Sequence, residues 1–132
     1  MKTYSFDIPI FDFKVKLIQI EDIKDLPSLE KHKWLKNMDD EDKEEIFTKI
    51  KRENFDGGTT FRSFPTQEFL VIFFKFLSEE AKINTYAHEK RHIEDRLMEY
   101  LGINDIETAG YLAGFLAVEF YKFIKKSEKL NN

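Results

Sequence analysis

The chain has 132 residues, 42% of them hydrophobic and 35% charged, which fits a single domain spanning residues 1–132. Its formal net charge of -4 lacks the basic excess that a phosphate backbone attracts, so nucleic acid is not expected as a partner. The absence of cysteine excludes disulfides and thiolate ligands, so any metal site must use His, Asp and Glu, and a reducing compartment is favoured.

The N-terminal part of the chain predicts a strand followed by helices. Four apolar residues alternate with charged ones and predict a half-buried strand: Phe11, Phe13, Val15 and Leu17. Residues 4–8 are either a separate short strand or an irregular lead-in, because Pro9 bends the chain after them. Residues 21–54 are rich in charge, with 19 of the chain's 46 charged residues, and predict one or two short, largely exposed helices.

The C-terminal part predicts strands and then two long helices. Residues 59–64 and 68–76 are rich in β-branched and aromatic side chains and predict two strands, the second deeply buried. Helical patterns follow over residues 84–101 and 105–125, and residues 126–132 predict a frayed polar tail. We therefore expect an α+β fold in which a small antiparallel or mixed sheet of about three strands packs on two helices.

No targeting or membrane segment is visible in the sequence. The N-terminus has no uninterrupted apolar stretch of the kind that a signal peptide contains. The longest apolar runs are interrupted by charges and fall short of the roughly 20 residues that a membrane span needs. We expect a soluble, cytoplasmic protein without a membrane partner, and the sequence leaves its oligomeric state open.

The segment His88-Glu89-Lys90-Arg91-His92 carries the chemistry of this sequence. It falls inside a predicted helix, so the two imidazoles lie one turn apart on one face and can point at a common metal ion. Glu89 lies about 100° round the helix from His88, where its carboxylate can take a proton from a water held by the metal. Two surface histidines among acidic residues would give the same pattern, so both interpretations stay open.

A zinc site of this kind needs a third protein ligand, for which Glu107 is the candidate and His32 the distant alternative. Glu107 begins the last predicted helix, near small residues that would allow a close approach between helices. The same residue fits the third position of a helix N-terminus, where a glutamate caps the backbone. A tight hairpin would also leave Glu107 about 10 Å along the helix axis from His92.

Two further residues are predicted to support the site. Asp95, one turn after His92, could orient an imidazole by a hydrogen bond. Tyr111, one turn after Glu107, could steady the site or donate to an oxyanion, and it fits equally well as an aromatic core residue.

Residues 88–115 resemble the small HExxH proteins encoded by phages and prophages, which are similar to gluzincin-type zinc peptidases. The shared pattern comprises the HExxH segment, the following Asp95, the helix end Gly102-Ile103 and Glu107-Thr108-Ala109-Gly110-Tyr111-Leu112-Ala113-Gly114-Phe115. The resemblance implies a minimal zincin-like fold that binds Zn²⁺ through His88, His92 and Glu107. It also implies that Glu89 is the general base.

Two functions follow from these observations. The first is a zinc-dependent hydrolase, a metallopeptidase acting on a peptide or protein, in which Glu89 activates water and the buried strand 68–76 lies beside the cleft. The second is a catalytically silent, zincin-like phage accessory or regulatory protein that binds a host protein. The small size and the acidic segment 21–54 favour the second, and the HExxH pattern favours the first.

Overall fold

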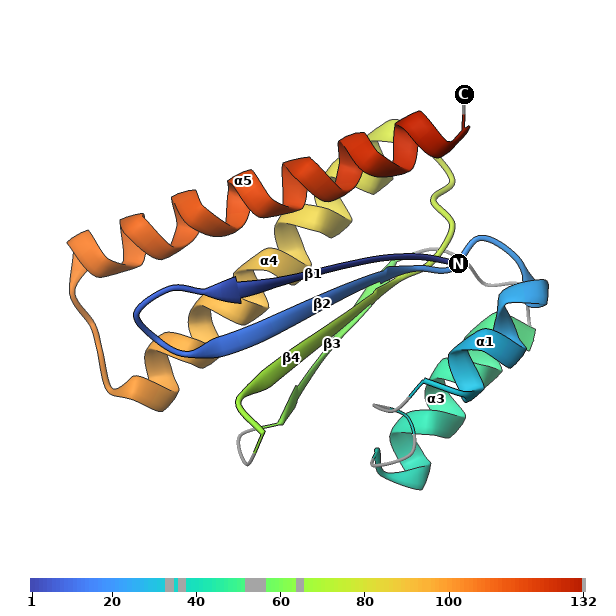
Figure 1. Ribbon diagram of the computed structural model, residues 1–132, viewed down its shortest axis with the longest axis horizontal. Coiled ribbons are helices and arrows are strands. Elements are labelled where there is room, and N and C mark those ends of the chain that lie inside the picture. The colour runs from blue at the N-terminus through green and yellow to red at the C-terminus, as the bar shows by residue number, and fades with distance from the viewer. Residues whose placement is uncertain (33–34, 36–37, 52–56, 64–65, 132) are drawn as a thin grey trace.

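The computed structural model describes residues 1–32, 35, 38–51, 57–63 and 66–131 (Figure 1). Its elements in chain order are β1 (Lys2–Ile8), β2 (Phe13–Gln19), a 3-10 turn (Ile23–Asp25), α1 (Leu26–Glu30), α3 (Asp40–Lys51), β3 (Gly58–Ser63), β4 (Glu68–Phe73), α4 (Glu79–Leu101) and α5 (Ile106–Asn131). The predicted α+β class is confirmed, with four strands instead of about three. The additional strand is β1, which includes residues 4–8, the segment for which the sequence allowed either a short strand or an irregular lead-in. Phe64, the predicted end of the strand over residues 59–64, and Asn132 lie outside the described residues, as do residues 33–34, 36–37 and 52–54 of the predicted helical segment 21–54.

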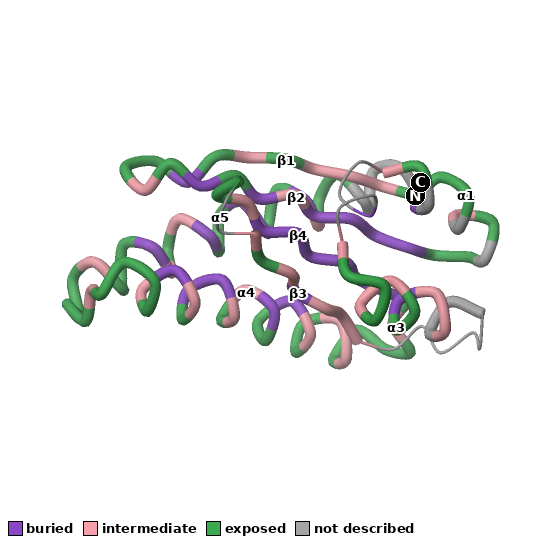
Figure 2. Tube along the Cα trace, turned by 90° about the horizontal axis from the view of Figure 1, so that it is seen from below, coloured by how far each residue is buried: buried purple, intermediate pink, exposed green. Residues whose placement is uncertain are grey.

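The four strands form one mixed sheet in the order β1-β2-β4-β3. β2 and β4 pair in parallel, whereas β1 pairs antiparallel with β2 and β3 pairs antiparallel with β4. β4 is thus an internal strand, and its residues from Phe69 onward are buried on both faces, which explains its continuous apolar run (Figure 2). The open edges of the sheet belong to β1 and β3.

Helices α4 and α5 cover one face of the sheet (Figure 1). The strands contribute alternate residues to this core, including Val15, Leu17 and Val71, and the helices contribute Ile93 and Leu116. α4 contacts β3 and α5 contacts β1, so the two helices lie toward opposite edges of the sheet. This separation decides which side chains α4 can share with α5 and which it can share with β3.

The other face of the sheet is covered over part of its area by α1, α3 and, between them, Leu35 and Met38 (Figure 1). Leu29, Leu35 and Ile46 from this region are buried against Ile18 and Ile72 of the sheet. The prediction of largely exposed helices over residues 21–54 is therefore incomplete, because a few apolar residues among many charges are enough to seal a small second core.

Both long helices extend beyond their predicted limits. α4 begins five residues earlier than predicted, where the Ser78 hydroxyl accepts a hydrogen bond from the backbone N–H of Ala81. It ends as predicted at Gly102, whose φ of 67° is the left-handed conformation that glycine adopts at low cost. α5 continues to Asn131, so the predicted frayed tail is helical up to that residue, since no Pro or Gly interrupts it. None of the described helices is long and apolar enough to cross a bilayer.

Candidate metal site

Helix α4 brings His88, Glu89 and His92 together. The two imidazoles project from successive turns, and their Nε2 atoms are 3.0 Å apart, with ring centroids 4.5 Å apart and rings nearly perpendicular. One ligand atom from each of the three residues lies within 4.8 Å of the others. Within the part of the chain that the structure describes, this is the group of three His, Asp or Glu side chains that could hold a metal ion.

The spacing of the two imidazole nitrogens fits a zinc ion. Two nitrogens that each lie about 2.05 Å from a tetrahedral zinc are separated by roughly 3.3 Å, so the observed 3.0 Å needs only a small opening of the rings. His88 is exposed and His92 is half-buried, which leaves the pair open to an ion arriving from solvent. These two residues supply imidazole nitrogens, which zinc prefers.

Glu89 differs from the histidines because it points inward. Its side chain is 3% exposed, and its Oε2 atom accepts a hydrogen bond from the hydroxyl of Thr60 on β3, a residue that is 7% exposed. Since an unpartnered buried carboxylate is costly, this hydrogen bond holds Glu89 in one orientation beside the imidazoles. The sequence analysis missed Thr60, because nothing local to residues 59–64 indicates which helix they contact.

Gly58 makes the close approach of α4 to β3 possible. A Cβ atom added there would lie 3.1 Å from Cγ of Glu89 and 3.2 Å from both Cγ2 of Thr85 and the Ile72 carbonyl oxygen. These distances are tighter than ordinary van der Waals contact, so a larger residue would push α4 away from the strand. The absence of a side chain at Gly58 leaves room for the Glu89 side chain.

Arg96 ties the same helix to the open edge of β3. Its Nη1 donates a hydrogen bond of 2.9 Å to the carbonyl oxygen of Thr60. Along an antiparallel strand, residues whose backbone groups bond to the partner strand alternate with residues whose backbone groups face away from it. The backbone N–H of Phe74 donates to the Gly57 carbonyl, so Gly57 bonds to its partner and, three residues along β3, Thr60 has backbone groups that face away from β4. The edge strand beside the histidines is thereby fixed by both a side-chain and a backbone contact.

Glu107 lies apart from this group. It is exposed in the first turn of α5, the helix that contacts β1 at the opposite edge of the sheet from β3. The N-terminal cap of α5 is Asp105, whose Oδ2 accepts hydrogen bonds from the backbone N–H (3.0 Å) and the hydroxyl (2.8 Å) of Thr108. These two hydrogen bonds lower the pKa of the Asp105 carboxyl. Glu107 is thus not part of the ligand group, and the side chain that makes this cap is that of Asp105.

The two predicted supporting residues also make other contacts or lie elsewhere. Asp95 forms an exposed ion pair of 3.0 Å with the Nε atom of Arg91 one turn earlier. Tyr111 is 49% exposed on α5 and belongs neither to the described core nor to the histidine group. The structure therefore brings three of the six predicted site residues together and places the other three outside that group.

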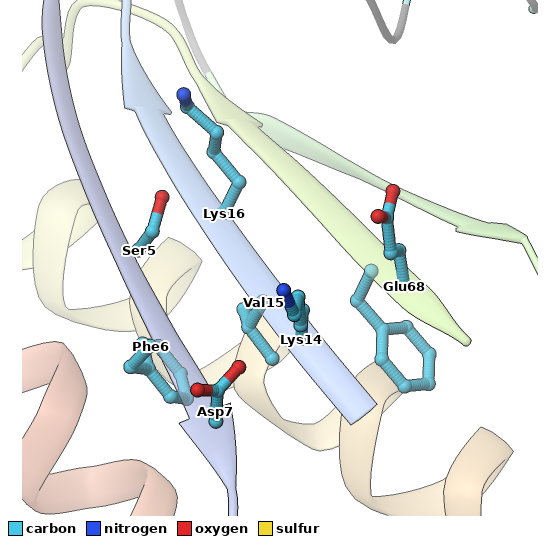
Figure 3. A pocket seen from close by; sticks show the side chains of 8 residues that line it. Ser5, Phe6, Asp7, Lys14, Val15, Lys16 and Glu68 are labelled. Atoms are coloured by element: carbon cyan, nitrogen blue, oxygen red, sulfur yellow. The ribbon is translucent and has the colours of Figure 1, made fainter. Parts of the chain in front are cut away.

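A shallow cavity of about 340 Å³ lies on the opposite face of the sheet from α4 (Figure 3). Asp7, Lys14 and Glu68 are direct cross-strand neighbours there, followed one step along by Ser5 and Lys16. Because side chains alternate along a strand, these residues project away from the face that α4 covers. The cavity is a charged part of the sheet surface that is separate from the histidine group.

No family model, curated protein or solved structure matches this chain.

Proposed function

We propose that the chain is a small zinc-dependent hydrolase with a zincin-like site, acting on a peptide or protein. The observation that carries the proposal is the convergence of two imidazole Nε2 atoms, 3.0 Å apart, beside a buried carboxylate held by a neighbouring strand. Zinc, when bound, would supply Lewis acidity between His88 and His92. With Glu107 outside the group, solvent or substrate would complete the coordination.

Glu89 is the general base in this proposal. Thr60 occupies Oε2 of the carboxylate, which leaves Oε1 to accept a proton from the attacking water. Because the hydrogen bond from Thr60 holds Oε2 in place, the carboxylate needs little reorientation when Oε1 takes the proton. The same carboxyl group can then pass the proton to the leaving amine.

The open edge of β3 supports a peptide as the substrate. The backbone groups of Gly58 face away from β4, on the same edge as those of Thr60. An extended peptide could pair with these groups and run alongside α4, as in β-strand addition. The strand predicted over residues 68–76 cannot offer such an edge itself, because β4 lies between β2 and β3 in the sheet.

Metal binding tests the proposal directly. We expect chelator-treated wild type to bind one Zn²⁺ per chain in a calorimetric titration and to gain thermal stability with zinc. His88→Ala and His92→Ala should lose this binding, whereas His32→Ala, the matched change at the remaining histidine, should keep it. Wild-type affinity no better than that of His88→Ala would refute the metal site.

The second function, a catalytically silent zincin-like protein that acts by contact alone, is favoured by one observation. Among the described residues, the ligand group holds two imidazoles and no carboxylate other than Glu89. The variant Glu89→Gln separates the two functions, since it preserves the fold and the zinc affinity. An enzyme should lose roughly 10²- to 10⁴-fold in peptide hydrolysis, whereas a silent protein would keep its biological effect unchanged.

A further inference from the structure

Helix α5 carries a second apolar stripe on the side opposite to the core. Its inner residues Leu112, Leu116, Phe120 and Phe123 are buried against the sheet and α4. Tyr111, Val118 and Tyr121 are 49%, 54% and 58% exposed, and at 100° per residue they lie on the far side of the helix. A helix that is apolar on two opposite faces is normally covered on both, and α5 forms the outermost layer of the molecule (Figure 1).

Two glycines in the same stripe have no explanation within the part of the chain that the structure describes. A Cβ atom at Gly110 or Gly114 would meet nothing within 4 Å, and neither residue has a positive φ. Each glycine inside a helix costs up to about 1 kcal/mol relative to alanine. Neither turn geometry nor packing in this chain offsets that cost, whereas close approach of another backbone from outside would.

The stripe is self-complementary about Leu116. Three pairs of residues lie at equal distances before and after Leu116 in the sequence. They are Glu107 and Lys125 at nine residues, Tyr111 and Tyr121 at five residues, and Gly114 and Val118 at two residues. In a pair of antiparallel helices related by a two-fold axis, residues at equal distances from the centre face each other. We infer that α5 is the interface of a homodimer in which two copies of this helix pack antiparallel through this stripe.

The chemistry of the opposed pairs supports this occupant. At each end Glu107 would meet Lys125 of the partner subunit, so both ends are attractive. A parallel pair would instead place like charges against each other. At the centre, Val118 of one subunit fits the space above Gly114 of the other, which allows a short distance between helix axes. Charge and volume therefore both specify a second, antiparallel copy of this chain.

The dimer would leave the candidate metal site accessible. The histidines lie on the side of α4 that contacts β3, whereas α5 lies toward the β1 edge. The stripe from Glu107 to Lys125 spans about 27 Å at 1.5 Å per residue, so the contact is small and a modest affinity is expected. The inference does not depend on the proposed hydrolase function.

Sedimentation velocity over micromolar to millimolar concentrations of the full chain tests the inference. We expect reversible dimerisation that Val118→Arg abolishes and that Leu77→Arg, the same kind of change at an exposed apolar residue outside α5, leaves intact. Glu107→Lys or Lys125→Glu should each raise the dissociation constant about tenfold, because symmetry alters two ion pairs at once. The two changes combined in one chain should restore it.

A glycine variant separates the dimer from simple helix stabilisation. Gly114→Ala should raise the thermal midpoint under monomeric conditions, because alanine is the better helix former, and yet weaken dimerisation by adding a methyl group at the contact. A chain that stays monomeric at millimolar concentration would overturn the inference, as would a dimer unaffected by Val118→Arg. A dimer that the double charge exchange fails to restore would overturn the antiparallel register.

Discussion

Replacing Thr60 by valine keeps the shape of the side chain and removes the hydroxyl that donates to the Glu89 carboxylate. Both residues are buried, at 7% and 3% exposure, so water cannot readily take the place of the lost donor. A hydrogen bond to a charged group contributes about 1.5–3 kcal/mol, and this is the expected loss in the free energy of unfolding. For 132 residues, about 2.1 cal/mol/K per residue converts the loss to a fall of roughly 5–11 °C in the thermal midpoint.

Thr59→Val is the matched control for this change. Thr59 is the neighbouring residue on the same strand, so its side chain projects to the opposite face of the sheet, away from Glu89. Calorimetry of both variants and wild type at neutral pH should show a loss for Thr60→Val only. Equal stability of the two variants would refute the idea that β3 holds the Glu89 carboxylate.

Three further predictions concern β1 and the ends of α4. Burial and the contact with Glu119 raise the pKa of Tyr4 to about 12, so the stability this phenol provides should be lost as pH rises from about 10 to 12. Denaturation midpoints across that range should fall less in Tyr4→Phe. Ser78→Ala should cost about 0.5–2 kcal/mol in urea unfolding, because it removes the N-terminal cap of α4. Gly102→Ala should cost roughly 1 kcal/mol, since alanine is strained at a φ of 67°, and a variant as stable as wild type would contradict the observed helix end.

The sequence predicted the histidine pair because its geometry is local. Once residues 84–101 are helical, a spacing of four residues places His88 and His92 on one face, whatever the rest of the chain does. The stop at Gly102 is equally local. Both predictions needed only the helical period and the preference of glycine for the left-handed conformation.

The contacts of Glu89 were not predictable in this way, because they depend on strand order. Thr60 and Gly58 lie about 30 residues before Glu89 in sequence, and they reach its helix only because β3 is an edge strand. The period-2 pattern of residues 59–64 predicts which side chains share a face of the sheet, but it does not predict which helix packs against that face. A threonine and a glycine in a strand carry no signal that a buried carboxylate will lie against them.

Glu107 shows how the same limit affects a residue chosen by sequence pattern. Its position after the HExxH helix suits a third ligand only if α5 folds back along the side of α4 that carries the histidines. The two helices contact each other, yet they lie toward opposite edges of the sheet, with α5 on the β1 side. The axial offset of about 10 Å expected from a tight hairpin already pointed to this difficulty.

The burial of Glu89 bears on the choice between a functional site and two ordinary surface histidines. On a solvated helix face this carboxylate would be exposed to water, as the carboxylate of Glu99 on the same helix is. Glu89 is instead 3% exposed, and its hydrogen-bond partner is a neutral hydroxyl. Such a group is destabilising relative to an apolar side chain of similar size. We therefore predict that Thr60→Val combined with Glu89→Met is at least as stable as wild type in urea unfolding, although Thr60→Val alone is less stable. Under the proposed hydrolase function, the double variant should keep zinc binding through the histidines and lose hydrolysis, which is the trade-off between stability and activity that a catalytic carboxylate would produce. A double variant much less stable than wild type would show instead that the Thr60 to Glu89 contact serves the fold.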